Sequence, residues 1–409
     1  MKIQSVRALE ILDSRGNPTV QAEVRLSNGI VACAQVPSGA STGRHEAREL
    51  RDGGVRFGGR GVLQAVRNVE QVLGPAVSGF EASDQTALDR RLIETDGTED
   101  KSRLGANAIL AVSCAVARAA AQSRGVPLWQ HLSEMAADPQ RRLPVPMINI
   151  ISGGLHAGRN LEFQDFLVIP RGYADLSAAL EATVRVHRET GRLLAERGYV
   201  LTGVADEGGW GPRLESNEHA VAVLREAIGA ADAIMDIALD VASTHFFEDG
   251  LYRLEDRRLS ATDMADLLQG WVTRYGVVSI EDPCAEDDWE GWRAITSRLG
   301  SSVRLVGDDL FVTNPVRLER GIRERAANSV LVKMNQIGTL TETFAVIGRA
   351  REAGFGAVIS ARSGETEDSF LADLAVASGA GQIKIGSITR SERLAKYNRL
   401  LQIERQELI

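Results

Sequence analysis

The stretch GVVSIEDP, residues 276–283, decides the fold because a short apolar run in it ends in two acidic residues. An apolar run of this length between a glycine and a proline is typical of a strand buried on both faces. Five other stretches share the pattern of an apolar run that delivers a polar residue: DIALDVA (236–242), VRLVGDD (303–309), NSVLVKMNQ (328–336), AVISARS (357–363) and GQIKIGS (381–387).

These strand ends recur at regular distances along the chain. The steps between them are 41, 27, 25, 28 and 23 residues, counted through the following positions: Asp240, Glu281, Asp308, Lys333, Ala361 and Lys384. One strand plus one helix needs about that length. Alternating strands and helices predict a parallel sheet, and convergent polar groups favour a closed barrel, where the carboxyl ends of the strands meet on one face. We therefore expect an α/β fold with a TIM-like (β/α)8 barrel.

The first third of the chain has a different pattern. Residues 1 to about 60 alternate like strands, with turn signals in RGNP (15–18) and at Asn28-Gly29, and residues 61–132 read as helices. The two prolines in RRLPVP, residues 141–146, indicate a boundary. The sequence thus predicts a small α+β domain over residues 1–132 and the barrel over residues 141–409.

Composition excludes several classes of function. The chain has 55 acidic and 47 basic residues, a net charge of −8, so we expect no nucleic-acid partner. Its most apolar run, residues 106–121, is too short to span a bilayer, and no apolar block of a signal peptide opens the sequence. Three widely spaced cysteines are typical of a reduced protein, and we expect a cytoplasmic one.

Three of the strand ends carry carboxylates that could share a metal ion. Asp240, Glu281 and Asp308 would repel one another if they met without a counter-charge, and a hard divalent cation such as Mg²⁺ prefers such oxygen ligands. The alternative is that each acid caps a helix or pairs with an arginine. Three acids in register along a barrel favour the metal.

The remaining strand ends carry cations. Lys333 and Lys384 would face the same cavity, where two ammonium groups beside a dication depress one another's pKa, so that one could act as a neutral base. The alternative is a pair of solvated surface lysines. Arg362 and Ser363 suit a phosphate or carboxylate, because arginine offers a planar fork of donors.

Three loops rich in small residues complete the candidate site. PSGASTG, residues 37–43, could close as a lid over a ligand. SGGLHAG, residues 152–158, carries His156, and DEGGWGP, residues 206–212, carries Glu207 with glycines that let backbone approach a ligand. An ordinary mobile loop and a structural histidine are the alternatives.

Together these residues resemble the enolase family over almost the whole chain. The motifs that carry the resemblance are DSRGNPTV (13–20), PSGASTG (37–43), GANAILAVS (105–113), DEGG (206–209), SIED (279–282), VGDDLFVTNP (306–315), KMNQIG (333–338), RSGETED (362–368) and QIKIGS (382–387). The resemblance implies a small N-terminal α+β domain, a modified α/β barrel, and a homodimer or an octamer. It implies a small phosphorylated or phosphonate carboxylate as substrate and Mg²⁺, two ions per site, as cofactor.

The resemblance also implies a role for each matching residue. Asp240, Glu281 and Asp308 would hold the tight Mg²⁺, and Ser41 would help to bind the second ion. Lys333 would remove the proton next to the substrate carboxylate, which Lys384 would bind. Arg362 and Ser363 would bind the phosphate. Glu207 would assist departure of the hydroxyl, and His156 would close in from its loop.

Two positions depart from the family pattern on the side that handles the leaving hydroxyl. Asp165 stands where enolases have Glu, and Ala361 stands where they have an active-site His; a smaller change puts Ala205 where Gly is usual. Asp is one methylene shorter than Glu, and Ala can neither donate nor accept a proton. We expect altered chemistry that forms a modified enolpyruvate. The alternatives are an ordinary phosphopyruvate hydratase and a non-catalytic binding protein.

Overall fold

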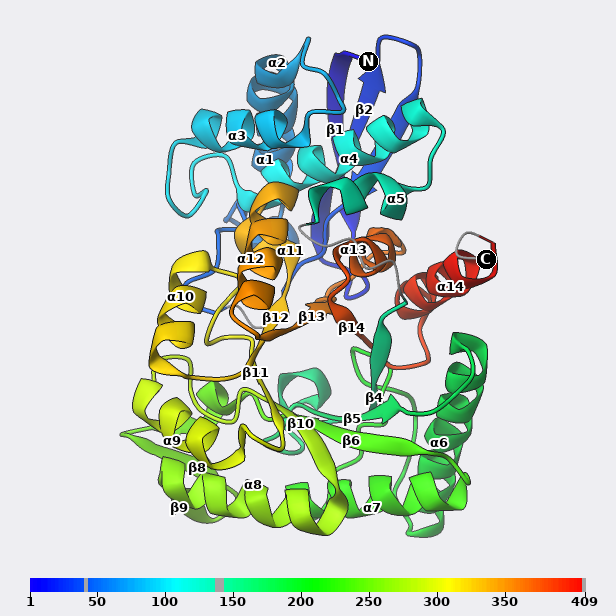
Figure 1. The fold of residues 1–409 in the computed structure, drawn as a ribbon, viewed down its shortest axis with the longest axis vertical. Coiled ribbons are helices and arrows are strands. Elements are labelled where there is room, and N and C mark those ends of the chain that lie inside the picture. Colours follow the sequence, from blue (N-terminus) through cyan, green and yellow to red (C-terminus); the bar gives the residue numbers. More distant parts are fainter. Residues whose placement is uncertain (40–42, 137–142, 407–409) are drawn as a thin grey trace.

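The computed structural model describes residues 1–39, 43–136 and 143–406. Figure 1 shows a smaller N-terminal part above a larger barrel. The elements of the N-terminal part are β1 (Ile3–Leu12), β2 (Pro18–Leu26), β3 (Val31–Gln35), α1 (Leu63–Asn68), α2 (Gly74–Val77), α3 (Gln85–Asp96), α4 (Ala106–Arg124) and α5 (Leu128–Leu132).

The three N-terminal strands form an antiparallel sheet in the order β1-β2-β3. Both predicted turns join them: Gly16 lies between β1 and β2 with φ +71°, and Gly29 lies between β2 and β3 with φ +87°. Glycine has no Cβ and adopts this left-handed backbone without strain. The expectation of strands up to about residue 60 is wrong, because the described residues after Gln35 make loops and one short 3₁₀ helix, Arg56–Gly59.

Eight strands close the barrel in the order β10-β11-β12-β13-β14-β4-β5-β6. Their bounds are β4 (Val145–Ser152), β5 (Asp165–Pro170), β6 (Met235–Asp240), β10 (Val277–Glu281), β11 (Arg304–Gly307), β12 (Ser329–Val332), β13 (Gly356–Ser360) and β14 (Gly381–Gly386). The predicted closed barrel is confirmed, but it is not wholly parallel. Strand β5 runs antiparallel to both neighbours. The 153–164 connection from β4 contains only the short 3₁₀ helix Gly154–Ala157 and lacks the α-helix that usually returns the chain for a parallel strand.

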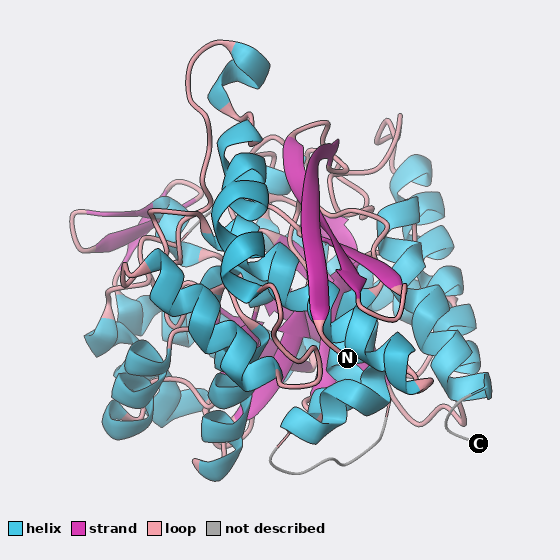
Figure 2. Cartoon of the chain, turned by 90° about the horizontal axis from the view of Figure 1, so that it is seen from above, coloured by secondary structure: helices cyan, strands magenta, loops and turns pink. Residues whose placement is uncertain are grey.

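Helices surround the barrel (Figure 2). They are α6 (Leu176–Glu196), α7 (Asn217–Ala230), α8 (Ala261–Tyr275), α9 (Trp289–Leu299), α10 (Pro315–Glu324), α11 (Met334–Ile337), α12 (Leu340–Glu352), α13 (Phe370–Ser378) and α14 (Ser391–Gln406). A separate small sheet comprises β7 (Phe247–Glu248), β8 (Leu251–Leu254) and β9 (Arg257–Leu259).

An apolar layer fills the barrel below the carboxyl ends of its strands. It consists of buried Met147, Leu167, Ile169, Ala238, Val306, Leu331 and Val358. Such a layer makes the interior a packed core, so that the polar residues at the strand ends rest on a rigid floor.

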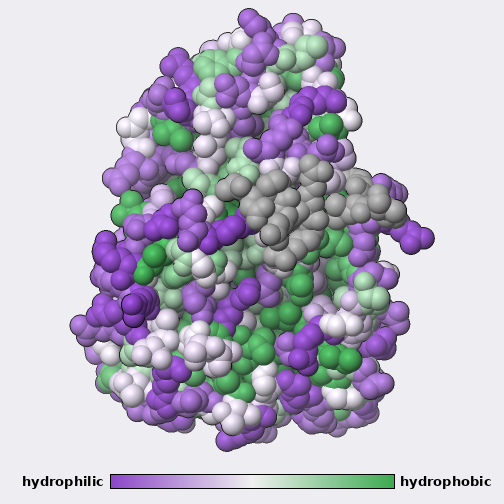
Figure 3. Space-filling view, viewed as in Figure 1, coloured by the Kyte–Doolittle hydropathy of each residue, from purple (hydrophilic) through white to green (hydrophobic). Residues whose placement is uncertain are grey.

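The outer surface is mainly polar on the face that Figure 3 shows, with small scattered apolar areas. Among the described residues no helix has the length and apolar character that crossing a membrane requires.

Candidate active site

Two predicted metal ligands and one predicted lysine meet at neighbouring strand ends. Asp240 is the last residue of β6, Glu281 is the last residue of β10, and the two lie opposite each other in the parallel register. The Nζ of Lys384, on β14, donates to Asp240 Oδ2 at 2.7 Å and to Glu281 Oε2 at 2.8 Å. All three residues are buried. One ammonium group therefore bridges two carboxylates inside the barrel mouth.

The other predicted pair lies one strand further along. Asp308 follows β11 and Lys333 follows β12, and Lys333 Nζ donates to Asp308 Oδ2 at 2.5 Å. Gln336, from the KMNQIG motif, donates to the other carboxylate oxygen of Asp308 at 3.0 Å. The strand ends thus converge on one cavity, but Asp240, Glu281 and Asp308 are not among the groups of described residues whose ligand atoms all lie within 4.8 Å of one another.

Nearby carboxylates raise the pKa of both lysines. Burial would lower the pKa of Lys333, but Asp308 and Glu281 are among the carboxylates that raise it, and the net shift is upward. Burial likewise opposes the charged form of Lys384, yet Asp240 and Glu281 hold its pKa well above the usual value. Lys384 does lower the pKa of Lys333, as the sequence suggested, but the carboxylates around the two ammonium groups outweigh this effect.

The donor set fits a divalent cation. Three buried carboxylates, Asp240, Glu281 and Asp308, face two ammonium groups, so negative charge is in excess. Burial, and then repulsion by Asp240, raise the pKa of Glu281 well above its usual value, which marks this carboxylate as incompletely compensated. Hard oxygen donors with surplus negative charge are what Mg²⁺ requires. In the structure the ammonium groups of Lys333 and Lys384 pair with these carboxylates.

The predicted phosphate-binding tip follows β13. Arg362 is 3% exposed and donates to Glu46 Oε2 at 3.0 Å and to Asn335 Oδ1 at 2.9 Å. Gly364 exchanges two backbone hydrogen bonds with Ser38, at 2.8 and 3.0 Å, which fixes the start of the predicted lid against this tip. A Cβ on Gly364 would lie 2.5 Å from Asp13 Oδ2, so only glycine allows this approach.

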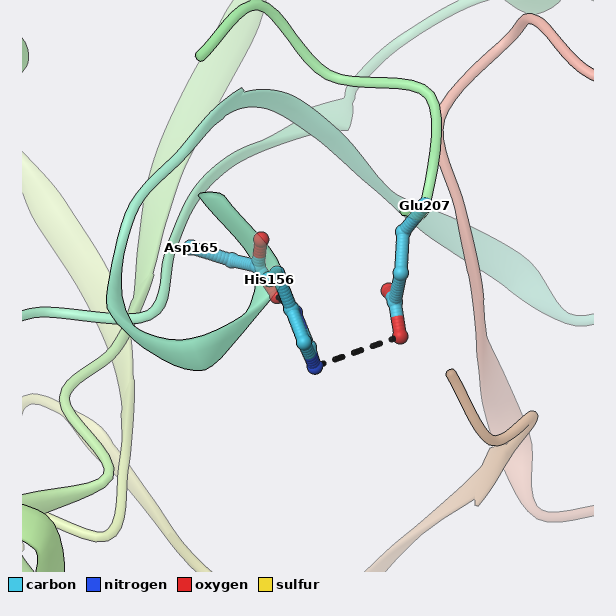
Figure 4. Close-up of side chains that lie close together, drawn as sticks. All are labelled: His156, Asp165 and Glu207. Carbon is cyan, nitrogen blue, oxygen red and sulfur yellow. Dashed lines mark ion pairs between the residues drawn. The ribbon is translucent and has the colours of Figure 1, made fainter. Parts of the chain in front are cut away.

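Three residues of the hydroxyl side lie together, as Figure 4 shows. The Nδ1 of His156 is 3.3 Å from Asp165 Oδ2, and its Nε2 is 3.8 Å from Glu207 Oε1. The side chains are 6%, 0% and 9% exposed in the order His156, Asp165, Glu207. A carboxylate thus faces each ring nitrogen of one buried imidazole.

This arrangement favours a charged imidazole. Burial alone would lower the pKa of His156, but Glu207 and Asp165 outweigh it and raise the pKa to about 9. Burial raises the pKa of Asp165 to about 6, against the attraction of His156. Burial would also raise the pKa of Glu207, but His156 and then Arg393 hold it below its usual value. At neutral pH the group is an imidazolium between two carboxylates.

Two groups of acidic or histidine side chains have ligand atoms within 4.8 Å of one another among the described residues. One is His156, Asp165 and Glu207; the other is Asp282, Asp308 and Asp309. In the first, the two carboxylates lie on opposite nitrogens of the ring, so a proton on each nitrogen satisfies them better than one metal ion. The second adds Asp282 and Asp309, which sequence reasoning passed over although both adjoin predicted ligands.

A small cavity of about 20 Å³ joins the predicted residues. It is lined by His156, Glu207, Asp240, Lys333, Ala361, Arg362, Ser363 and Lys384, among others. Ala361 is 7% exposed, and its methyl group contributes no polar atom to the cavity lining. Ser41 lies outside the described residues.

The sequence analysis did not identify the polar residues that form hydrogen bonds or ion pairs with the predicted site residues. Gln164 donates to Asp240 Oδ2 at 3.0 Å, and Glu46 pairs with Arg362 at 3.0 Å. Gln336 and Asn335 could have been found, since both lie in the KMNQIG motif beside Lys333. Glu46 has no such signal, because its partner Arg362 is 316 residues away in sequence.

A barrel with carboxylates and lysines at the carboxyl ends of its strands defines the class of metal-dependent α/β-barrel enzymes. Residues 140–408 match the family described as enolase, C-terminal TIM barrel domain, and residues 3–132 match enolase, N-terminal domain. The chain belongs to the enolase family. It is an enolase-superfamily enzyme of lyase type, a family that typically uses Mg²⁺ and binds small-molecule substrates. The division into domains 1–132 and 141–409 stays our proposal.

Proposed function

We propose that this enzyme acts, with Mg²⁺, on a substrate of the 2-phosphoglycerate or phosphoenolpyruvate type and forms a modified enolpyruvate, as carboxyphosphonoenolpyruvate synthase does. The observation that carries the proposal is the contrast between the two sides of the site. The side with Lys333, Lys384 and three carboxylates has every charged residue that the family pattern implies. On the hydroxyl side, the imidazole of His156 is paired with Asp165, and Ala361 lines the same cavity.

On the metal side, Asp240, Glu281 and Asp308 would hold one Mg²⁺, and Ser41 would contribute to a second. When bound, Mg²⁺ neutralises the substrate carboxylate and favours the negative charge that develops there on proton loss. Lys384 would then leave Asp240 and Glu281 and bind that carboxylate. Arg362 and Ser363 would hold the phosphorus group through charge-assisted hydrogen bonds.

Lys333 is proposed as the base. Its Nζ would take the proton from the carbon next to the carboxylate, and the C–H electron pair would pass into an ene-diolate. This requires Lys333 to lose its own proton first, which its pairing with Asp308 opposes. A cation held by Asp308 would weaken this pairing and so favour the neutral form of Lys333.

The hydroxyl side decides between the two enzymatic readings. Loss of a hydroxyl as water needs a proton at that oxygen, and Glu207, Asp165 or His156 would have to deliver it. Each ring nitrogen of His156 already faces a carboxylate, Asp165 at 3.3 Å and Glu207 at 3.8 Å, and this attraction opposes release of a proton. Misplacing a catalytic group by about 1 Å can cost about 10²-fold in rate, so the shorter Asp165 favours weak dehydration.

An ordinary phosphopyruvate hydratase is the second candidate. It is favoured by the presence of a buried imidazolium, since His156 carries a proton at neutral pH and lines the same cavity as Lys384 and Lys333. On this reading His156 replaces the group that Ala361 lacks.

The test follows 2-phosphoglycerate by proton and phosphorus NMR in D₂O with purified protein and Mg²⁺. Exchange of the α-proton without dehydration is the expected result and directs the search to a second, phosphorus-containing substrate. Accumulation of phosphoenolpyruvate at an enzyme-like rate establishes the ordinary hydratase instead. Absence of both exchange and dehydration refutes both readings.

A further inference from the structure

A second, larger cavity lies beside the phosphate-binding tip. Its volume is about 640 Å³, and its lining includes Gly39 and Gly43, both of which belong to the predicted lid, residues 37–43. Five arginines and two glutamates line it: Arg15, Arg44, Arg48, Arg51, Arg60, Glu46 and Glu49. We call this cavity the arginine pocket.

The two glutamates do not neutralise the arginine pocket. Glu46 is engaged by Arg362, which lies outside the pocket, at 3.0 Å. Glu49 is engaged by Arg51 at 2.7 Å, and Arg51 also donates to two backbone carbonyls. Of the other four guanidinium groups, those of Arg44 and Arg48 form exposed ion pairs outside the pocket, and that of Arg15 has a carboxylate only at 3.9 Å.

Those four arginines have donors to spare. The Nε of Arg15 is buried and has no hydrogen-bond partner among the described residues, and the nearest carboxylate oxygen, on Asp13, is 3.9 Å from its guanidinium. The side chain of Arg60 has one such partner, Asn17 Oδ1 at 3.1 Å. Burial lowers the pKa of Arg15 despite the attraction of Asp13, as expected for a cation short of counter-charge.

Arg44 and Arg48 form the rim of the pocket. Their side chains are 74% and 73% exposed, and their nearest carboxylates, on Asp287 and Asp100, lie at 3.4 and 3.6 Å. Exposed pairs of this kind contribute little and yield readily to a better anion. The pocket thus has guanidinium donors of Arg15 and Arg60 inside it, and exposed guanidinium donors of Arg44 and Arg48 at its rim.

The arginine pocket adjoins the active site through a shared wall. Glu46 lines the pocket and its carboxylate binds Arg362, while Arg362 also lines the small inner cavity. The turn that carries Arg15 is fixed to the same tip, since Ser14 N donates to the Glu365 carbonyl at 2.7 Å. An anion in the arginine pocket would therefore lie next to the phosphorus group of the substrate.

We propose that the arginine pocket binds a second small phosphorus oxyanion, a phosphate or a phosphonate, beside the substrate held by Arg362 and Ser363. Several guanidinium forks around one cavity suit a tetrahedral dianion, which offers three oxygens, better than a single carboxylate. As a place for a second reactant this inference rests on the proposed function, but the binding itself does not.

The binding test uses full-length protein with Mg²⁺ and saturating phosphoenolpyruvate, which fills the inner site. Methylphosphonate and inorganic phosphate are titrated separately by calorimetry at fixed ionic strength, because anion binding is salt-dependent. We expect saturable binding of one equivalent that phosphoenolpyruvate does not displace. Tighter binding of methylphosphonate than of phosphate identifies a phosphonate ligand, and the reverse identifies phosphate.

Two variants locate the anion. Arg60→Gln should weaken binding by about tenfold, the size of one lost charge-assisted contact. Arg48→Gln should also weaken it, and this exposed position carries no buried contact that could unfold the protein. Arg258→Gln, on β9 and 51% exposed, is the matched control and should bind as the wild type does.

Three results would overturn the inference: no saturable binding to the wild type, displacement by phosphoenolpyruvate, or equal affinity in Arg60→Gln, Arg48→Gln and the wild type. These outcomes are independent of the D₂O assay. Anion binding without proton exchange refutes the proposed function and leaves the arginine pocket, whereas exchange without anion binding does the opposite.

Discussion

Lys384→Met tests whether this lysine occupies the place of a metal ion. The ammonium group lies 2.7 Å from Asp240 and 2.8 Å from Glu281, and the three side chains are at most 8% exposed. Removing one partner of a buried ion pair costs about 3–5 kcal/mol, since it leaves the other charge unpaired. Without metal we therefore expect the variant to lose about that much stability in urea unfolding.

The same change should improve Mg²⁺ binding. Two unit charges about 4 Å apart interact by about 4 kcal/mol in a partly solvated site. Relief of only a third of that repulsion, about 1.4 kcal/mol, lowers Kd about tenfold. Calorimetric titration of Mg²⁺ into substrate-free protein measures this Kd, and unfolding in EDTA and in Mg²⁺ measures the recovered stability.

Lys396→Met is the matched control. Lys396 is also buried, pairs with Glu365 at 2.9 Å and lies on α14, away from the three predicted ligands. This variant should be destabilised to a similar degree, with Mg²⁺ affinity unchanged. Unchanged or weaker Mg²⁺ binding in Lys384→Met would refute the placement of the metal between Asp240 and Glu281.

Three further predictions concern proton handling. Lys333→Ala should lower α-proton exchange of 2-phosphoglycerate by about 10²–10⁴-fold, the usual contribution of a general base, as NMR in D₂O would show; exchange at the wild-type rate contradicts the assignment. Restoring the family residues in Asp165→Glu/Ala361→His should raise phosphoenolpyruvate formation by about 10²-fold over the parent, measured by absorbance; no gain would mean that these positions do not limit dehydration. The pKa of His156 rises from 6.5 to about 9 on folding, so its charged form stabilises the protein below pH 6.5 and this contribution disappears as pH rises through 9. The stability difference between wild type and His156→Gln should therefore shrink by about 3 kcal/mol over that range, and a pH-independent difference would contradict the charged imidazole.

The periodic parts of the fold were predictable because local rules decide them. The turns at Gly16 and Gly29 follow from glycine's backbone freedom, and the barrel follows from strand ends spaced about one strand and one helix apart. The antiparallel β5 was not predictable from that rhythm. The 153–164 connection before it lacks a crossover α-helix, a feature that the spacing of the strand ends does not reveal.

The site shows a similar division. The convergence of Asp240, Glu281 and Lys384 follows from strand order, but their protonation does not, because it depends on which charges come closest in space. Sequence placed two lysines in one cavity and implied mutual repulsion. In the structure each lysine contacts a carboxylate, and attraction outweighs repulsion and burial together.

Asp165 and Ala361, the two departures from the family pattern, both belong to the side of the site that is expected to handle the leaving hydroxyl. With Asp165 the carboxyl is withdrawn by one methylene, and His156 lies between it and Glu207 at 3.3 and 3.8 Å. A second imidazole at position 361 would stand in the same cavity wall and compete for the same proton. Alanine there leaves both carboxylates to His156, which stabilises its charged form and weakens it as an acid. Under the proposed function, the pair of changes would convert a proton-transferring side into an ion pair, while the side proposed to remove a proton keeps all its charged groups.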